Sequence, residues 1–382
     1  MSRIIIATEY VEESQNSTGY FWSRIILGLK TEGFDVAVLE QRSLNKFHLL
    51  QDNSKILKRI FKQLIIAADL ANQIYRTIRG NSIVFTGTNP TIFLCLMPIV
   101  KKIFNVKWVL LVHDVFPDNL LAAGLIKKNN PIFKITSNYF SWVYSAPDKL
   151  ICIGRDMQAL MCQKTKGKAK TVFVPNWANG DDVFPLVRSE LNFFNIYGWE
   201  NHVVFQFFGN IGRVQGVENL LQAISLVTAK NAAFVFIGDG ALVPSVLKFI
   251  ENNPNKEIKF LGSKSMDQKN EVLALCDVAL VSLEVGMLGL GVPSKSYFSL
   301  AAGKPLLAAV DAESEIGLML NEFPVGWRCD SGSPYQLANL IDEICARPEE
   351  INKKMPREIF LNNYSENIMI KKINQIIRSI CV

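Results

Sequence analysis

The feature that most constrains the fold of this chain is an alternation of short apolar runs with longer amphipathic stretches. In the first half, the apolar runs are RIIIAT (3–8), DVAVLE (35–40), SIVFTG (82–87), WVLLVH (108–113), KLICIG (149–154) and TVFVPN (171–176). Nearly continuous apolar runs are typical of parallel strands that are buried on both faces. Helical segments separate most of these runs, so the pattern predicts an α/β domain with a doubly wound parallel sheet.

The pattern stops over residues 179–200, which we interpret as a linker, and then starts again. The second set of runs is VVFQFFGN (203–210), AAFVFIGDG (232–240), IKFLG (258–262), VALVSL (278–283), PLLAAV (305–310) and VGWRC (325–329). We therefore predict two tandem Rossmann-like domains, residues 1–178 and 200–362, and expect a C-terminal helix at about 365–382 to pack back on the first. Two such domains face each other across a cleft at the carboxyl ends of their strands, where ligands bind in open α/β folds.

Composition narrows the class of partner. The net charge of +6, from 41 Lys and Arg against 35 Asp and Glu, is too small for a protein that binds nucleic acid, but it permits an anionic ligand or membrane surface. The 7 cysteines show no CxxC spacing, which favours reduced thiols in the cytoplasm over disulfides. The N-terminal apolar run is too short for a signal peptide, and the most apolar stretch, 92–100, is too short to span a bilayer.

Three motifs follow strands and therefore point into the expected cleft. In FFGNIGRVQGVENL (207–220), glycines allow close backbone approach, the following helix offers free N–H groups, and Arg213 adds a cation. The motif predicts a phosphate site, although an ordinary strand-to-helix turn with a solvated arginine fits the same letters.

The second motif is GVPSKSYFSLAAGKP (291–305). Pro293 and Ser294 indicate a helix start, with Ser294 as its N-cap, so Lys295 falls in the first turn. A cation there is unfavourable by up to about 1 kcal/mol. A bound diphosphate would reverse that sign, whereas a surface lysine that extends to water would leave the motif without function.

The third motif is LLVHDVFPDNLLAAG (110–124), in which His113 and Asp114 stand where a strand gives way to a loop. A lone histidine is often only a structural hydrogen-bonding group. Its position at a strand end in the expected cleft makes a role in the site an equal alternative.

In this order on tandem Rossmann-like domains, the three motifs resemble GT-B glycosyltransferases, and most of all the retaining family 4. Within that family the resemblance is to bacterial transferases that assemble O-antigen, capsule and colanic-acid-type polysaccharides. HDVFPD resembles the subgroup's His/Asp-Leu-Trp-Pro-Asp signature, and GNIGRVQGVENLLQA and VPSKSYFSLAAGKP are similar to its donor-side motifs. APDKLICIGRDM and VPNW resemble its connecting elements, so the likeness covers nearly the whole chain.

The resemblance implies that the C-terminal domain holds a nucleotide diphosphate sugar, expected to be a UDP-sugar, and that the N-terminal domain binds a lipid-linked saccharide acceptor. Arg213 and Lys295 would bind the diphosphate, and His113 would contact the transferred sugar. The backbone at Leu261 and Gly262 would flank the base. The expected binding set also includes Gly19, which we expect in the loop before the first helix, together with Asn210, Gly212 and Ser294.

Two departures from the family pattern bear on the site. Many relatives have a ribose-binding glutamate five residues before the glycine of AAGKP, where this chain has Phe298. Relatives outside the subgroup often have Lys-Gly where this chain has Gln215-Gly216, so Lys295 becomes the second half of a two-cation clamp with Arg213.

The resemblance also implies a mechanism. Retaining transfer breaks the bond between the anomeric carbon and the diphosphate, and cations and helix N-termini aimed at the leaving phosphate stabilise the transition state. Front-face attack, with the leaving phosphate helping to deprotonate the acceptor hydroxyl, requires no protein nucleophile. The sequence has no DxD motif, so we expect neither a metal nor a cofactor, with Arg213 and Lys295 in the metal's place.

Other functions fit the sequence less well. A nicotinamide-dependent dehydrogenase needs GxGxxG after the first strand, and ATEYVEESQNSTG does not supply it. A nucleotide-sugar 2-epimerase shares the GT-B fold but needs no acceptor. A non-catalytic subunit of a polysaccharide assembly complex remains the third alternative, since the ribose-binding glutamate is missing.

A lipid-linked acceptor implies that the enzyme works at the inner face of the plasma membrane, as a cytoplasmic protein bound peripherally. In the helix after Ser54, four cations alternate with apolar residues, namely Lys55, Lys58, Arg59 and Lys62 with Ile56, Leu57, Ile60, Phe61 and Leu64. A basic amphipathic helix can lie in an anionic interface, and Lys101-Lys102 add to that charge. Alternatively, the apolar stripe packs on the sheet and the cations are solvated.

Overall fold

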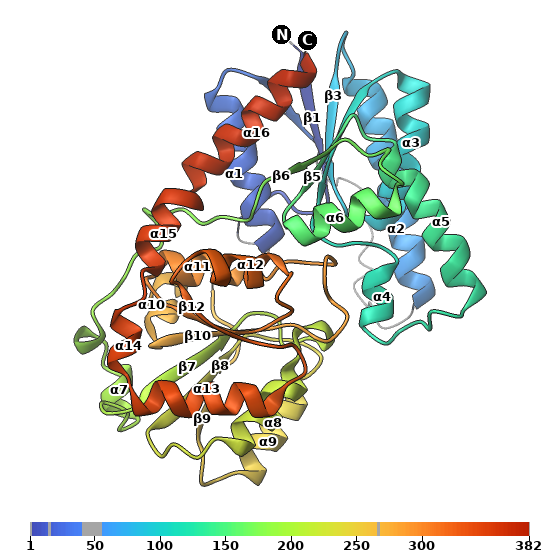
Figure 1. The fold of residues 1–382 in the computed structure, drawn as a ribbon. Helices are drawn as coiled ribbons and strands as arrows, with labels where there is room; N and C mark the ends of the chain where they lie inside the picture. Colours follow the sequence, from blue (N-terminus) through green and yellow to red (C-terminus); the bar gives the residue numbers. More distant parts are fainter. Residues whose placement is uncertain (1, 14–16, 40–55, 266–267, 382) are drawn as a thin grey trace.

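The structure, a computed structural model, describes residues 2–13, 17–39, 56–265 and 268–381, with no side-chain placement for 56–60. It consists of two α/β domains, one above the other in Figure 1, each built around a six-stranded sheet. All pairings in both sheets are parallel. The two-domain parallel architecture predicted from the alternating pattern is confirmed.

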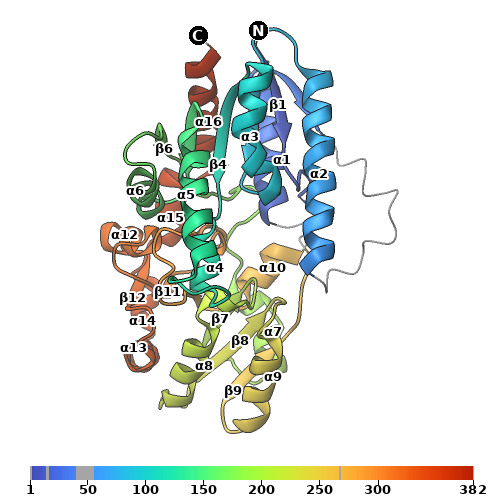
Figure 2. The same cartoon turned by 90° about the vertical axis from the view of Figure 1, so that its right-hand side faces the viewer.

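The N-terminal sheet has the strand order β2-β1-β3-β4-β5-β6. Its strands are β1 (Arg3–Ala7), β2 (Asp35–Val38), β3 (Ile83–Gly87), β4 (Lys107–Val112), β5 (Lys149–Cys152) and β6 (Thr171–Phe173). Its helices are α1 (Ser17–Thr31), α2 (Ile56–Thr77), α3 (Thr91–Phe104), α4 (Asp118–Ala122), α5 (Pro131–Ser145) and α6 (Arg155–Lys164). Helices α2, α3 and α5 lie side by side over one face of the sheet, and α1 lies over the other (Figures 1 and 2).

The C-terminal sheet has the order β12-β11-β10-β7-β8-β9. Its strands are β7 (Val203–Phe208), β8 (Ala232–Ile237), β9 (Glu257–Phe260), β10 (Val278–Ser282), β11 (Leu306–Ala309) and β12 (Gly326–Cys329). The elements of the linker and of this domain's helical layers are η3 (Arg188–Glu190), α7 (Phe193–Ile196), η4 (Arg213–Gln215), α8 (Val217–Leu226), α9 (Val243–Asn252), α10 (Lys269–Ala274), α11 (Lys295–Ala301), α12 (Glu315–Glu322), α13 (Pro334–Ala346), α14 (Glu349–Asn352) and α15 (Pro356–Asn363).

The strand orders locate the positions where ligands are expected. In each sheet, the direction in which successive strands are added reverses once, between β1 and β3 in the first and between β7 and β10 in the second. The loops that leave the carboxyl ends of the strands on either side of such a point diverge, which leaves space for a ligand. Continuous apolar strands support this arrangement, since β3, β8, β10 and β11 are buried along their whole length.

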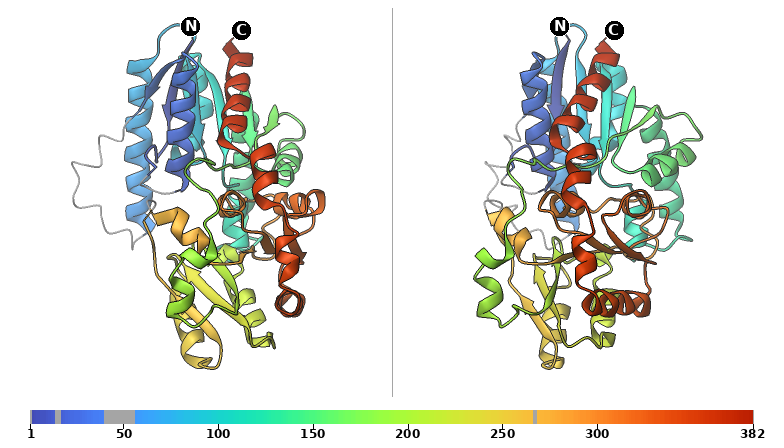
Figure 3. Two further views of the ribbon diagram at one scale, coloured as in Figure 1. Left: turned by 90° about the vertical axis from the view of Figure 1, so that its left-hand side faces the viewer. Right: turned by 60° about the vertical axis from the view of Figure 1, so that its left-hand side comes forward.

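The last helix returns to the first domain. After α15, the chain crosses beside the linker, where Ala178 and Ser365 form an isolated parallel bridge. Helix α16 (Glu366–Cys381) then runs along α1, as Figure 3 shows. Gly28 makes this approach possible, because an added Cβ would lie 2.2 Å from Cγ2 of Ile370. The chain therefore passes twice between the domains.

Ion pairs connect the domains on two sides of the boundary. On α6, the guanidinium of Arg155 donates to both carboxylate oxygens of the buried Glu315 on α12. On the other side, Lys269 of α10 pairs with Glu13 of the first domain at 2.9 Å. The apolar core is also continuous across this boundary, since Tyr297 and Phe298 of α11 belong to the same buried cluster as the first domain's strands.

One local prediction was wrong. Gly19 was expected in a loop before the first helix, but α1 begins at Ser17, and Gly19 is a buried residue of its first turn. The loop expectation relied on glycine as a helix breaker, and packing of the neighbouring Tyr20 and Phe21 in the core outweighs the modest cost of a helical glycine.

Candidate functional site

A hollow of about 200 Å³ lies at the reversal point of the C-terminal sheet. It is lined by the ends of β7 and β10, by the start of α11 and by one residue of α1: Ser17, Phe207, Phe208, Gly209, Asn210, Gln215, Leu280, Val281, Ser282, Val292, Pro293, Ser294, Lys295 and Ser296. We call this the donor-side hollow. Lys295 is the one charged side chain among these described lining residues.

Lys295 is the first residue of α11, so the prediction that it stands in the first helical turn is confirmed. Its Nζ lies 4.7 Å from the ring centroid of Phe208 and 5.4 Å from that of Phe298. Burial lowers the pKa of this ammonium to about 8, with a smaller contribution from Lys269. Aromatic faces compensate a buried cation only in part, so the hollow favours a ligand that brings negative charge.

Gly209 provides the space that the lysine stem needs. Its φ is +141°, and an added Cβ would lie 3.3 Å from Cγ of Lys295. The residue that follows β7 therefore has no side chain, which leaves room for the stem of Lys295. Asn210, the next residue, is exposed and lines the same hollow.

Arg213 lies nearby in the chain but outside the hollow. It is the first residue of η4 in the loop after β7, and its side chain is exposed. Gln215 of the same short helix does line the hollow, and Gly216 follows with a φ of +59° and leads into α8. Of the two predicted clamp cations, the structure places Lys295 in the wall and Arg213 at the surface of the adjoining loop.

Three further predicted binding residues, Ser294, Leu261 and Gly262, differ in whether they line the donor-side hollow. Ser294 lines the hollow and stands at the predicted N-cap position of α11, but its backbone is already helical and its side chain makes no capping hydrogen bond. Leu261 and Gly262 follow β9 and are not among the lining residues. Their backbone is tied to β8, because Leu261 donates to the carbonyl of Phe236 and Gly238 donates to that of Gly262.

A second hollow of about 150 Å³ adjoins the first. Its lining residues come mainly from the carboxyl edge of the N-terminal sheet: Ser17, Thr18, Phe21, His113, Asp114, Ile153, Asn176, Val292 and Ser294. We call this the acceptor-side hollow. Ser17, Val292 and Ser294 line both hollows, so the two form one cleft with walls from both domains.

His113 is held in this hollow as a neutral imidazole. Both ring nitrogens are buried without a hydrogen-bond partner among the described residues, and burial lowers the pKa of the ring to about 4. The ring of Phe21 packs edge-on at a centroid distance of 6.2 Å. A neutral imidazole offers one donor and one acceptor, which matches the hydroxyl groups of a sugar.

Asp114 adjoins His113 at the end of β4, and burial raises the pKa of its carboxyl to about 6. Gly291 of the C-terminal domain approaches it closely, since an added Cβ there would lie 4.0 Å from an Asp114 carboxylate oxygen. The first-domain loop after β4 and the second-domain loop before α11 therefore meet at the cleft.

Sequence reasoning missed Asn176, Thr18 and Phe208 as cleft residues. Asn176 and Phe208 stand in or just after strand runs that were recognised, so the strand-end rule that selected His113 could have found both. Thr18 carried no such signal, because α1 was expected to start later in the chain.

Phe298 occupies the position at which many relatives have the ribose-binding glutamate. It is buried, and its ring centroid lies 5.2 Å from that of Tyr20 and 6.5 Å from that of Phe21. The residue therefore joins an aromatic cluster between α11 and α1, beside Lys295. An apolar domain contact stands where a polar ligand contact was expected.

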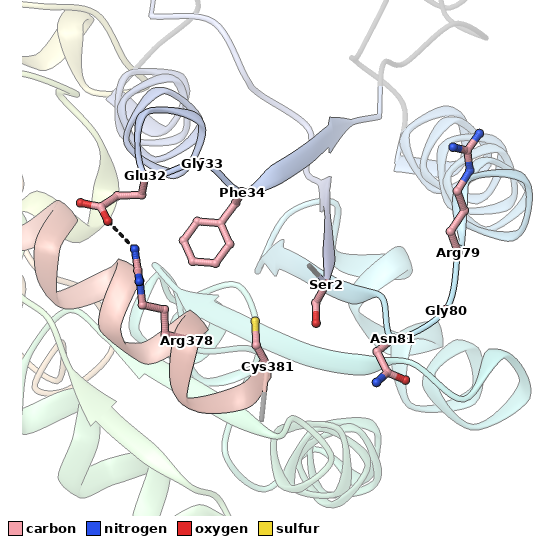
Figure 4. Close-up of a pocket in the computed structure, with 9 residues that line it drawn as sticks. All are labelled: Ser2, Glu32, Gly33, Phe34, Arg79, Gly80, Asn81, Arg378 and Cys381. Carbon is pink, nitrogen blue, oxygen red and sulfur yellow. Dashed lines mark hydrogen bonds and ion pairs between the residues drawn. The ribbon is translucent and has the colours of Figure 1, made fainter.

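A larger hollow, of about 520 Å³, lies away from the cleft near the two chain ends. Figure 4 shows Arg378 of α16 paired with Glu32, beside Phe34, with Arg79 and Asn81 across the opening. This hollow is at the amino edge of the N-terminal sheet, where the strands of an open α/β fold do not direct ligand-binding loops. Size alone therefore does not identify the functional site.

The described part of the chain shows no sign of two other classes of site, a metal centre and a membrane-spanning helix. Among the described residues there is no cluster of three or more His, Cys, Asp or Glu side chains suited to hold a metal ion. None of the described helices combines the length and apolarity needed to cross a membrane.

Comparisons with known proteins match this arrangement. The sequence model for glycosyl transferases group 1 matches residues 190–359. The chain is 42% identical to the probable glycosyltransferase WbjE of Pseudomonas aeruginosa over 99% of this chain and 98% of that protein. It is 24% identical to the putative colanic acid biosynthesis glycosyl transferase WcaI of Escherichia coli K12, over 62% of this chain and 60% of that one.

Solved structures show the same fold. HepE of Anabaena, crystallised in complex with UDP, superposes with a TM-score of 0.71 at 14% identity, over 99% of this chain and 100% of that chain. WaaG, a glycosyltransferase involved in lipopolysaccharide biosynthesis, superposes with a TM-score of 0.68 at 12% identity, over 98% and 99% of the two chains.

Two facing parallel α/β domains with a cleft at their strand ends form the GT-B fold, which HepE and WaaG share. The chain belongs to the family of glycosyl transferases group 1. The resemblance noted from its motifs is thereby confirmed.

Proposed function

We propose that the protein transfers a sugar from a nucleotide diphosphate sugar to a lipid-linked saccharide acceptor in the biosynthesis of a bacterial surface polysaccharide such as O-antigen, lipopolysaccharide or capsule. The observation that carries the proposal is Lys295, a partly buried ammonium at the sheet's reversal point whose hollow contains no described carboxylate. Bound phosphate oxygens would supply the missing negative charge.

The donor is a UDP-sugar in this proposal. HepE, which shares the fold, was crystallised with UDP and also with UDP-glucose. The diphosphate would lie against Lys295 and the backbone at Gly209 and Asn210. Arg213 would fold over it from the exposed η4 loop, and the backbone at Leu261 and Gly262 would flank the base. Gly212, which precedes Arg213, would leave room for the phosphates.

The acceptor-side hollow would orient hydroxyl groups. The neutral ring of His113 would contact the transferred sugar, because an uncharged imidazole can donate to one oxygen and accept from another. Val292 and Ser294 line both hollows, so a sugar bound across them would present its anomeric carbon to the acceptor.

The chemistry is a retaining transfer without a metal. The acceptor oxygen forms a bond to the anomeric carbon while the bond from that carbon to the diphosphate oxygen breaks with its electron pair. The acceptor proton passes to the leaving phosphate. Lys295 and Arg213 stabilise the charge that develops on the diphosphate, which is the role a divalent cation has in other transferases.

We place the reaction at the cytoplasmic face of the plasma membrane, with the enzyme bound there peripherally. All seven cysteines are free thiols, which suits a reducing compartment. The names of WcaI and WaaG refer to colanic acid and lipopolysaccharide biosynthesis, and such products are assembled on lipids.

The direct test is an assay of the full chain with a panel of UDP-, GDP- and dTDP-sugars, with and without a lipid extract from the source bacterium's membranes. We expect UDP release from one UDP-sugar that depends on the extract, with a glycosylated lipid as product. Interconversion of the sugar nucleotide without extract would assign the protein as an epimerase. Failure to bind or turn over any donor would indicate a non-catalytic subunit.

A further inference from the structure

The outer face of helices α3 and α5 is apolar and exposed to solvent. Along α5, Ile132, Ile135, Tyr139 and Trp142 recur at spacings of three and four residues, and Ile99 and Ile103 form a parallel stripe on α3. Ile135 is 70% exposed, Ile103 is 68% exposed and Trp142 is 49% exposed. We call these six residues the α3–α5 face. A contiguous apolar stripe of this size on a surface layer marks an interaction site rather than scattered exposed residues.

The two helices hold this face together as one surface. The hydroxyl of Tyr139 donates to the carbonyl of Cys95 at 2.8 Å, and Nζ of Lys101 donates to the carbonyl of Ala146 at 2.8 Å. The rings of Tyr139 and Trp142 lie 5.4 Å apart. Figure 2 shows α3 and α5 side by side toward the viewer. The stripes are therefore fixed relative to each other.

The charges around this face are of one sign. Lys102, Lys127, Lys128 and Lys134 are exposed, and none forms an ion pair with a described residue. From residue 70 to residue 147, the only acidic residues in the sequence are Asp114 and Asp118. Asp114 lines the acceptor-side hollow and Asp118 pairs with Lys164, so neither neutralises these lysines.

We infer that the α3–α5 face docks on an anionic lipid surface. The apolar stripes would enter the interface and the four lysines would lie among the anionic headgroups. Tyr139 and Trp142 are the residue types that favour the boundary between headgroups and acyl chains. A second copy of this chain fits less well, because a two-fold contact through this face would bring its unpaired lysines together.

That the face binds lipid is inferred independently of the proposed function. Only the reason for this binding, access to a lipid-linked acceptor, rests on the proposed function. Helix α4, which connects to α5, follows directly from His113 and Asp114, so the docked face adjoins the acceptor-side hollow along the chain. A lipid-linked saccharide could then reach the cleft while its lipid remains in the bilayer. Vesicle binding itself requires neither donor nor acceptor, so it is measured independently of transfer.

The surface differs from the one expected from sequence. The predicted basic segment overlaps the start of α2. However, Lys55 and the side chains of Lys58 and Arg59 lie outside the described residues. Of the predicted apolar stripe, Phe61 and Leu64 are the members whose side chains are described, and both are exposed, whereas Ile66, Leu70 and Ile74 farther along α2 pack in the core. The α2 prediction therefore stays a prediction, and its four-residue Gln variant provides a parallel arm of the experiment.

The experiment measures sedimentation of the full chain with vesicles of phosphatidylcholine alone or with about a third phosphatidylglycerol. One variant carries Ile132→Ser, Ile135→Ser and Trp142→Ser, and a second carries Lys127→Gln, Lys128→Gln and Lys134→Gln. The matched control, Lys166→Gln with Lys168→Gln and Lys170→Gln, removes the same charge from the exposed loop before β6. UDP binding and the thermal midpoint report whether each variant is folded, and they should match the wild type because the changed residues are exposed and lie outside the donor-side hollow.

We expect the wild type and the control to bind the anionic vesicles at low salt, and the lysine variant to bind about 100-fold more weakly. The Ser variant should lose binding to the anionic vesicles although its lysines are intact. Tryptophan emission should shift to the blue on binding, and Trp142→Phe should abolish the shift while preserving sedimentation, since four of the six tryptophans are fully buried. Equal binding by all variants, or loss restricted to the α2 Gln variant, would overturn the inference. A dimer in solution that the Ser variant dissociates, without lipid binding, would assign the face to a second copy.

Discussion

The two hollows of the cleft differ in the ionisable groups that line them. The donor-side hollow holds a partly buried cation, Lys295, and no described carboxylate, so a bound anion would provide the opposite charge. The acceptor-side hollow holds His113 and Asp114. Burial lowers the pKa of His113 and raises that of Asp114, and both shifts favour the neutral form of the side chain. In the proposed function, the C-terminal domain would bind the charged leaving group and the N-terminal domain the neutral hydroxyl groups. Bond breaking would occur where the two hollows meet.

The largest expected effect comes from removing the donor-side cation. We expect Lys295→Ala to reduce kcat by about 100-fold, the scale of losing one preorganised group that stabilises charge in a transition state. Steady-state assays measure the effect, with Lys304→Ala as control, since that lysine leaves the same segment at its other end and does not line the hollow. Similar rates for both variants would remove Lys295 from the mechanism.

A smaller loss is expected for Arg213→Ala, about tenfold in kcat/KM. Its side chain is exposed in the structure, so folding it onto the diphosphate would cost conformational freedom that Lys295 has already lost. The same assay with Lys264→Ala, a change in another exposed cation of this domain, provides the control. An Arg213→Ala rate equal to wild type would leave Lys295 as the single cation of the site.

For the acceptor side, we expect a change at Asp114 to alter the free energy of unfolding rather than to cause a large change in rate. Because the folded-state pKa of Asp114 is raised to about 6, its ionised form destabilises the fold, and that cost grows as the pH rises from about 4 through 6. Asp114→Asn should therefore raise the free energy of unfolding by about 1–2 kcal/mol at pH 7.5 and by much less at pH 4. Urea titrations at both pH values measure this, and an equal effect at both would contradict the assignment.

The smallest expected effect is that of metal removal. If Lys295 and Arg213 neutralise the diphosphate, EDTA should leave the transfer rate within about twofold of its untreated value, since no metal is then required at the leaving group. The assay compares EDTA-treated enzyme with the same enzyme after Mg²⁺ or Mn²⁺ is restored. Complete loss that either metal reverses would mean that the cations of the donor side do not suffice.

Much of the fold could be predicted from the sequence, because parallel strands buried on both faces give continuous apolar runs. Each of the twelve runs overlaps an observed strand, and the differences are confined to the ends. The chain's own helix boundaries were harder. Near the start of α1, Tyr20 packs against Phe298 of the other domain, and no local signal reports such a contact.

The residues of the candidate site could likewise be predicted only in part. His113 and Lys295 could be selected from strand-end and helix-start positions, and both line the cleft. The burial of Phe298 in an aromatic cluster could not, since its partners Tyr20 and Phe21 belong to the other domain. The motif also leaves open whether Arg213 is exposed. Motif spacing locates backbone positions well, and long-range packing decides which side chains reach the ligand.

The central claim is that the donor-side hollow binds a nucleotide diphosphate through Lys295. Calorimetric titration of the full chain with UDP tests this most directly, in wild type, Lys295→Met and Lys304→Met, at pH values from 6.5 to 9.5. We predict that wild-type affinity falls as the pH rises through about 8, because the ammonium loses its proton there, and that Lys295→Met binds at least about tenfold more weakly with no such fall. Lys304→Met should match the wild type. Equal and pH-independent binding by wild type and Lys295→Met would contradict the account.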